Sequence, residues 1–87
     1  MAPNLLLSGE LLQELHKTYR YLRVVPDEHD GRAVLLAAKS LYFGISGKKF
    51  DVSDQKWDTI PVTEPPANAR TVVQIYPNRI WDIEELL

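Results

Sequence analysis

Apolar residues in the first quarter of the chain recur with the period of an amphipathic helix. Ser8 can cap such a helix, and Glu10 lies in its first turn, where the helix dipole favours an acidic residue. Because Pro26 disfavours helical backbone at the residue before it, the pattern predicts a helix over about 8–23. The alternative is a strand over Tyr19–Val25, since tyrosine and valine favour strands. The apolar residues that share one face of the predicted helix are Leu11, Leu12, Leu15, Tyr19 and Leu22.

The next apolar segment is rich in alanine and leucine and predicts a second helix, over about 31–43. A polar turn precedes it, Asp30 can cap its start, and Gly44 is typical of a helix end. Its broad core face would hold Val34, Leu35, Ala37, Ala38, Leu41 and Tyr42. Residues three and four apart are neighbours on a helix, so a second stripe lies outside that face. This stripe consists of Arg32, Leu36, Lys39 and Phe43.

After Gly44 the hydrophobic period changes to two, which is the period of a strand. Three strands are predicted: one around Phe50 and Val52, one over Trp57–Val62 and one over Arg70–Tyr76. Pro61 places the second strand at a sheet edge or on a bulge, because proline has no amide hydrogen. The proline-rich segment 63–69 predicts a loop. A short last helix is expected over Arg79–Leu87, capped by Asn78 and docked on the rest of the chain.

The predicted order is helix, helix, three strands and helix. Consecutive strands joined by short turns favour a mostly antiparallel sheet covered by helices, so we expect one small α+β domain over residues 1–87. The composition, 45% hydrophobic and 25% charged, suits a soluble folded protein. The chain has no cysteine, no signal-peptide pattern and no apolar run of about 20 residues. We therefore expect a cytoplasmic protein that does not bind a membrane.

Two short segments contain residue types that some cofactors require. Asp27–Asp30 holds three carboxylates and an imidazole, but its spacing differs from that of an EF-hand and a polar turn is expected there anyway. The turn Gly44–Lys49 lacks both the first glycine and the final serine or threonine of a phosphate-binding loop. No motif couples a nucleophile to a base. The sequence thus predicts no enzyme, no cofactor and no metal.

Two surfaces suit a protein partner instead. One is the apolar and basic stripe on the second predicted helix, and the other is Trp81, which lies off the apolar face of the last predicted helix. Both could also be buried within the domain. The leading hypothesis is a non-enzymatic protein-binding module: an accessory subunit, an antitoxin-like partner, or an inhibitor from a phage or other mobile genetic element. Its partner would be another protein or a second copy of the chain. The predicted partner-binding residues are Arg32, Leu36, Lys39, Phe43 and Trp81.

The alternative hypothesis is a nucleic-acid-binding module. Basic groups beside an exposed aromatic on the first predicted helix could hold phosphates and stack a base, and a lysine turn could add phosphate contacts. The charge of the chain disfavours this alternative, because nucleic-acid-binding domains usually carry an excess of basic residues, whereas this chain has a net charge of −2 with both signs scattered. The residues that this alternative requires are Lys17, Arg20, Tyr21, Arg23, Lys48 and Lys49.

Overall fold

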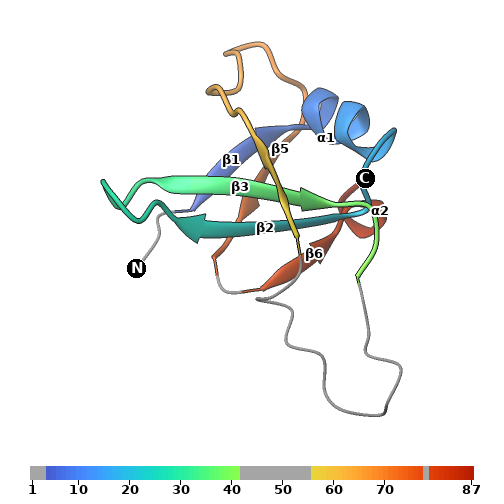
Figure 1. Ribbon diagram of the computed structural model, residues 1–87. Helices are drawn as coiled ribbons and strands as arrows, with labels where there is room; N and C mark the ends of the chain where they lie inside the picture. The colour runs from blue at the N-terminus through green and yellow to red at the C-terminus, as the bar shows by residue number, and fades with distance from the viewer. Residues whose placement is uncertain (1–3, 42–55, 78) are drawn as a thin grey trace.

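The computed structural model describes residues 4–41, 56–77 and 79–87 (Figure 1). It confirms the α+β class, but the described part of the chain holds six strands in two sheets, and one N-terminal helix, between β1 and β2, where two were predicted. The elements in order are β1 (Leu5–Ser8), α1 (Gly9–His16), β2 (Tyr21–Pro26), β3 (Ala33–Ala38), β4 (Asp58–Ile60), β5 (Val72–Ile75), β6 (Ile80–Asp82) and α2 (Ile83–Leu86). No described helix is long and apolar enough to cross a bilayer.

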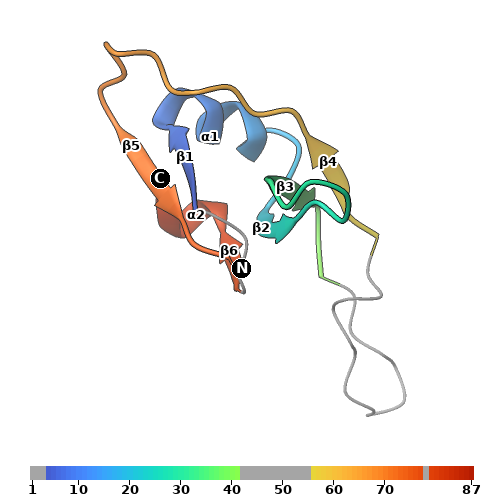
Figure 2. The ribbon, with the colours of Figure 1, turned by 90° about the vertical axis from the view of Figure 1, so that its left-hand side faces the viewer.

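All strand pairs are antiparallel, and no described strand bonds to both sheets. β1 pairs with β5, and the other sheet has the order β4-β3-β2-β6. Since β5 and β6 follow one another in the chain, the chain leaves one sheet and enters the other between them. Figure 2 shows the β1–β5 pair facing β2, β3 and β4, with α1 between them at one end and the 61–71 segment crossing from β4 to β5.

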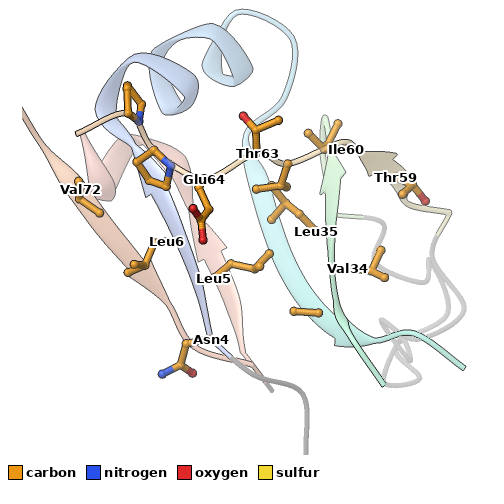
Figure 3. Close-up of a pocket in the computed structure, with 14 residues that line it drawn as sticks. Asn4, Leu5, Leu6, Val34, Leu35, Thr59, Ile60, Thr63, Glu64 and Val72 are labelled. Atoms are coloured by element: carbon orange, nitrogen blue, oxygen red, sulfur yellow. The ribbon is translucent and has the colours of Figure 1, made fainter. Parts of the chain in front are cut away.

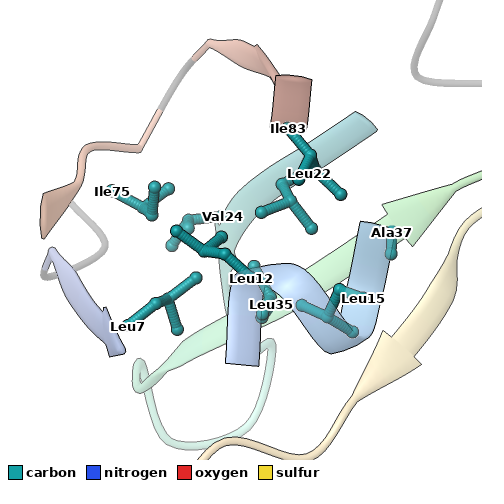
Figure 4. Close-up of a cluster of buried hydrophobic side chains, with 9 residues drawn as sticks. All are labelled: Leu7, Leu12, Leu15, Leu22, Val24, Leu35, Ala37, Ile75 and Ile83. Carbon is teal, nitrogen blue, oxygen red and sulfur yellow. The ribbon is translucent and has the colours of Figure 1, made fainter. Parts of the chain in front are cut away.

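The hydrophobic core fills the space between the sheets (Figure 4). Alternate residues of each strand point inward, as the strand period requires: Leu22 and Val24 of β2 are opposite Ala37 and Leu35 of β3. Burial of one such leucine contributes about 1.5–3 kcal/mol. The remaining members come from the other elements: Leu7, Leu12, Leu15, Ile75 and Ile83.

The helix predicted over 8–23 is wrong in its second half. α1 begins as expected, because the Ser8 hydroxyl accepts a hydrogen bond from the Leu11 amide at 3.2 Å. It ends at His16, and β2 follows from Tyr21, close to the alternative strand prediction. Tertiary contacts outweigh the helical pattern here, because residues 21–26 as a strand form hydrogen bonds with β3 on one side and with β6 on the other.

The helix predicted over 31–43 is also wrong, because its first part forms β3. Every residue of β3 pairs with β2 in a long hairpin, so backbone hydrogen bonds and inward burial outweigh the helix propensity of alanine and leucine. The predicted polar turn is confirmed. Gly31 adopts a left-handed φ of 73°, and the carboxylates of Asp27 and Asp30 accept hydrogen bonds from the His29 and Arg32 amides at 2.8 and 2.9 Å.

The C-terminal third confirms two of the predicted strands and corrects the last helix. β4 and β5 lie inside the predicted ranges 57–62 and 70–76, but the strand around residues 50–52 lies outside the described residues. Instead of a helix over Arg79–Leu87, residues 80–82 form β6 and only residues 83–86 are helical. Asp82 caps α2 by accepting from the Glu84 amide, and the predicted cap, Asn78, is outside the described residues. β1, which no sequence pattern predicted, is paired by distant β5.

Candidate functional site

The stripe predicted for a protein partner does not form, since it depends on a helix over 31–43. In β3, Leu36 points away from the core that its neighbours Leu35 and Ala37 fill, and it is half-buried. Arg32 is exposed in the turn before β3, and Lys39 is exposed just after it. Phe43 lies outside the described residues. These residues therefore do not share one surface in the way a helix would arrange them.

Trp81 is occupied by contacts within its own chain. It stands opposite Leu22 in the pairing of β6 with β2 and is half-buried. Its indole nitrogen donates to the Tyr76 backbone oxygen at 3.2 Å, and the two rings stack with centroids 6.3 Å apart. The Arg79 guanidinium lies 3.9 Å from the centre of the indole ring. The partner-binding role of Trp81 stays a prediction, and much of its ring already has neighbours.

The basic residues proposed to contact nucleic acid are separated by the change from helix to strand. Lys17 forms an ion pair with Glu14, at 3.2 Å between Nζ and Oε2. Arg20 lies 3.3 Å from Asp82 and 3.8 Å from Glu84, and the hydrogen bond and attraction of Asp82 raise the pKa of its guanidinium. Opposite charges thus offset both cations locally.

The other members of that set are no longer on a helix. Tyr21 and Arg23 are two residues apart in β2, so both point to its outer face, and both are half-buried. Lys48 and Lys49 lie outside the described residues. The single basic face on which the nucleic-acid alternative depends is therefore not formed by the described residues.

The described residues form an open cleft of about 710 Å³ between the two sheets (Figure 3). One wall is the start of β1, with Leu5 and Leu6. The opposite wall is the first half of β3, with Val34 and Leu35, and Ile60 of β4 beside them. This position follows from the topology, because no described strand bonds to both sheets and the cleft opens between the edge of β1 and the β3–β4 side of the larger sheet.

The segment that crosses from β4 to β5 covers part of the cleft. Val62, Pro65 and Pro66 add to its apolar lining. Glu64 is the one charged side chain among the described lining residues, and Figure 3 shows its carboxylate extending from this segment toward Leu5. The cleft is thus mainly apolar, with a single negative charge.

Two strand edges border the cleft without a partner among the described strands. β1 is bonded to β5 on one side only. β3 is bonded to the short β4 through Leu35–Ala37, which leaves the edge at Ala33 and Val34 unpaired on that side. An unpaired edge presents backbone N–H and C=O groups that can bond to an added strand.

Two exposed apolar side chains extend this surface over the edge of β1. Leu6 is 50% exposed and Val72 is 48% exposed, and both line the cleft. Their register places them on the same outer face of the β1–β5 pair. Exposed apolar groups that adjoin a cleft are typical of a surface that another molecule covers.

Glu64 forms no hydrogen bond or ion pair with another described residue. The sequence did not reveal this site, because its walls come from segments far apart in the chain. No family model, no curated protein and no solved structure matches this chain.

Proposed function

We propose that this protein is a non-enzymatic protein-binding module that holds an extended segment of a partner protein in the open cleft. The observation that carries the proposal is the coincidence of an apolar cleft with two unpaired strand edges. An extended peptide that is added to a sheet edge gains main-chain hydrogen bonds, and neighbouring pockets select its side chains.

The cleft is large enough to receive side chains of a bound segment. Its volume of about 710 Å³ lies within the range of roughly 300–1,000 Å³ that is typical of small-ligand pockets. An added strand would contact β1 or the Ala33–Val34 edge through its backbone, and its apolar side chains would cover Leu6. An accessory subunit, an antitoxin-like partner and an inhibitor could each use such a surface.

Nucleic-acid binding is the weaker candidate. It would have to use Tyr21 and Arg23 on the outer face of β2, without the contiguous basic helix that motivated it. The ion pairs of Lys17 and Arg20 would compete with phosphate for these cations. Binding of this kind should fall steeply with salt, which separates it from binding in an apolar cleft.

A selection from a library of random displayed peptides tests the proposal. Peptides selected on the wild type are titrated into the ¹⁵N-labelled protein, where we expect the amide shifts to cluster at Leu5, Leu6, Ala33 and Val34. Leu6→Ser should weaken binding about tenfold or more, because it removes an apolar contact at the mouth of the cleft. Leu87→Ser is the matched control, since Leu87 is 54% exposed but does not line the cleft.

Three outcomes would contradict the proposal. Peptides could bind the Leu6→Ser variant as well as the wild type, or their shifts could map to a different face. Alternatively, no peptide could be selected while single-stranded or double-stranded oligonucleotides bind in a salt-sensitive manner and shift the amides of β2. That last result would favour the nucleic-acid alternative.

A further inference from the structure

We infer that the partner segment carries a lysine or arginine that pairs with Glu64 when its apolar side chains fill the cleft. This inference rests on the proposed function and adds the charge of the partner. It would make Glu64 the residue that determines which extended segments are accepted.

Glu64 has no basic neighbour among the described residues that line the cleft. It is exposed to solvent. In the part of the chain that the structure describes, no hydrogen bond or ion pair involves it, whereas other acidic residues have cationic partners: Glu14 pairs with Lys17, and Asp82 pairs with Arg20. No described cation therefore offsets the charge of Glu64.

Filling the cleft would desolvate the Glu64 carboxylate. Figure 3 shows Glu64 extending into the space that an occupant would fill, between the walls formed by Leu5 and Leu35. Apolar side chains placed there would remove water from the carboxylate, and an unpaired charge removed from water is costly. A cation on the same segment offsets this cost and forms a charge-assisted hydrogen bond.

The charge of Glu64 would also discriminate among extended segments. An acidic segment would be repelled by Glu64, and a purely apolar segment would leave the carboxylate unpaired. Extended apolar segments are common in unfolded and partly folded proteins, so the cleft alone would be poorly selective. One carboxylate in an apolar cleft therefore favours an apolar and basic segment over both competitors.

The experiment uses the same random peptide library on three forms of the full chain: wild type, Glu64→Gln and Glu64→Lys. Glu64 is exposed and outside the regular elements, so all three forms are expected to fold, which the ¹⁵N spectrum checks. We expect lysine and arginine to be enriched on the wild type and aspartate and glutamate on Glu64→Lys. Glu64→Gln should show neither preference.

A charge-swap cycle then measures the pairing. One selected basic peptide and its counterpart, with glutamate in place of the basic residue, are titrated into the wild type and Glu64→Lys. We expect the wild type to bind the basic peptide about tenfold more tightly than the acidic one, and the preference to reverse in the variant.

The outcomes separate this inference from the proposed function. Binding that requires Leu6 but ignores the charge at residue 64 overturns the inference and leaves the docking function in place. Binding that ignores Leu6 overturns the docking function. A dimer of the wild type that dissociates in Leu6→Ser, seen by sedimentation, would mean that a second copy fills the cleft, and this too overturns the inference.

Discussion

The two sides of this small fold treat their apolar residues differently. On the closed side β6 bonds to β2, and Leu22 and Ile83 are completely buried. On the open side β1 and β3 lack a common neighbour among the described strands, and Leu6 and Val72 stay about half exposed. The core itself is covered on both sides, because Leu7 and Leu35 are as inaccessible as Leu22. The difference lies in Leu6 and Val72, which are outer apolar side chains that line the cleft.

Charges follow the same division. On the closed side, Arg20 contacts Asp82 and Glu84, and the His16 imidazole lies 3.5 Å from Glu84. On the open side Glu64 has no partner among the described residues. Asp82 and Glu84 on the closed side thus have cationic partners, whereas the one charged side chain among the described residues that line the cleft has none.

The largest expected effect comes from two adjacent leucines of β1. Leu7 is fully buried, whereas Leu6 is half exposed at the cleft. Leu7→Ala should lower the free energy of unfolding by about 2–5 kcal/mol, because it removes core contacts and leaves a cavity. Leu6→Ala should change it by less than about 0.5 kcal/mol, as surface substitutions commonly do. Urea denaturation of both variants measures the difference, and equal losses would contradict the division into core and docking surface.

The hairpin between β2 and β3 connects the two sides, so weakening it should affect both. Gly31 has a φ of 73°, and a Cβ built there would meet no atom within 4 Å. Gly31→Ala should therefore cost about 1–2 kcal/mol from backbone strain alone. Gly31→Asn is the control, because asparagine tolerates this conformation and should lose less. Thermal unfolding compares the two, and an alanine variant as stable as the wild type would show that the turn adjusts.

Local sequence patterns predicted the parts of the fold that local interactions determine. The Ser8 cap, the polar turn before Arg32 and the strands β4 and β5 each follow from a short stretch of residues. β3 was predicted wrongly because its residues, AVLLAA, form a continuous apolar run, which periodicity alone does not assign to a helix or to a strand. The choice depends on β2, which lies across the hairpin.

The candidate site could not be predicted in the same way. Its two walls are β1, which is fixed by the distant β5, and β3, which the sequence assigned to a helix. The predicted partner residues Leu36 and Lys39 were chosen from helical spacing, so they were misplaced when that helix proved to be a strand. Whether a strand edge is unpaired depends on which strands pair in the folded chain. The hydrophobic pattern of a single segment does not contain that information.

Removing a charge on the closed side should have a smaller effect on stability. Arg20→Gln removes the cation that Asp82 and Glu84 share. Because Arg20 and Glu84 are exposed, we expect a small fall in the urea midpoint at low salt, which disappears near 1 M NaCl where charges are screened within about 3 Å. Lys17→Gln is the control and should change the midpoint less, because Lys17 has a single partner within its own turn. A fall that persists at high salt would indicate lost packing instead of lost charge.

The smallest expected effect concerns β4, the short edge strand beside the cleft, and it depends on pH. The Tyr19 hydroxyl donates to Asp58 of β4 at 2.9 Å, and this hydrogen bond, with desolvation and the nearby negative charge, raises the pKa of Tyr19. A raised pKa in the folded state means that the contribution is fully present below the ordinary tyrosine pKa of about 10 and is lost as pH rises through the folded value. The wild type should therefore lose more stability than Tyr19→Phe between about pH 8 and 11 in urea denaturation. Equal losses in Tyr19→Phe and the wild type would mean that pairing with β3 alone holds β4 at the edge of the cleft.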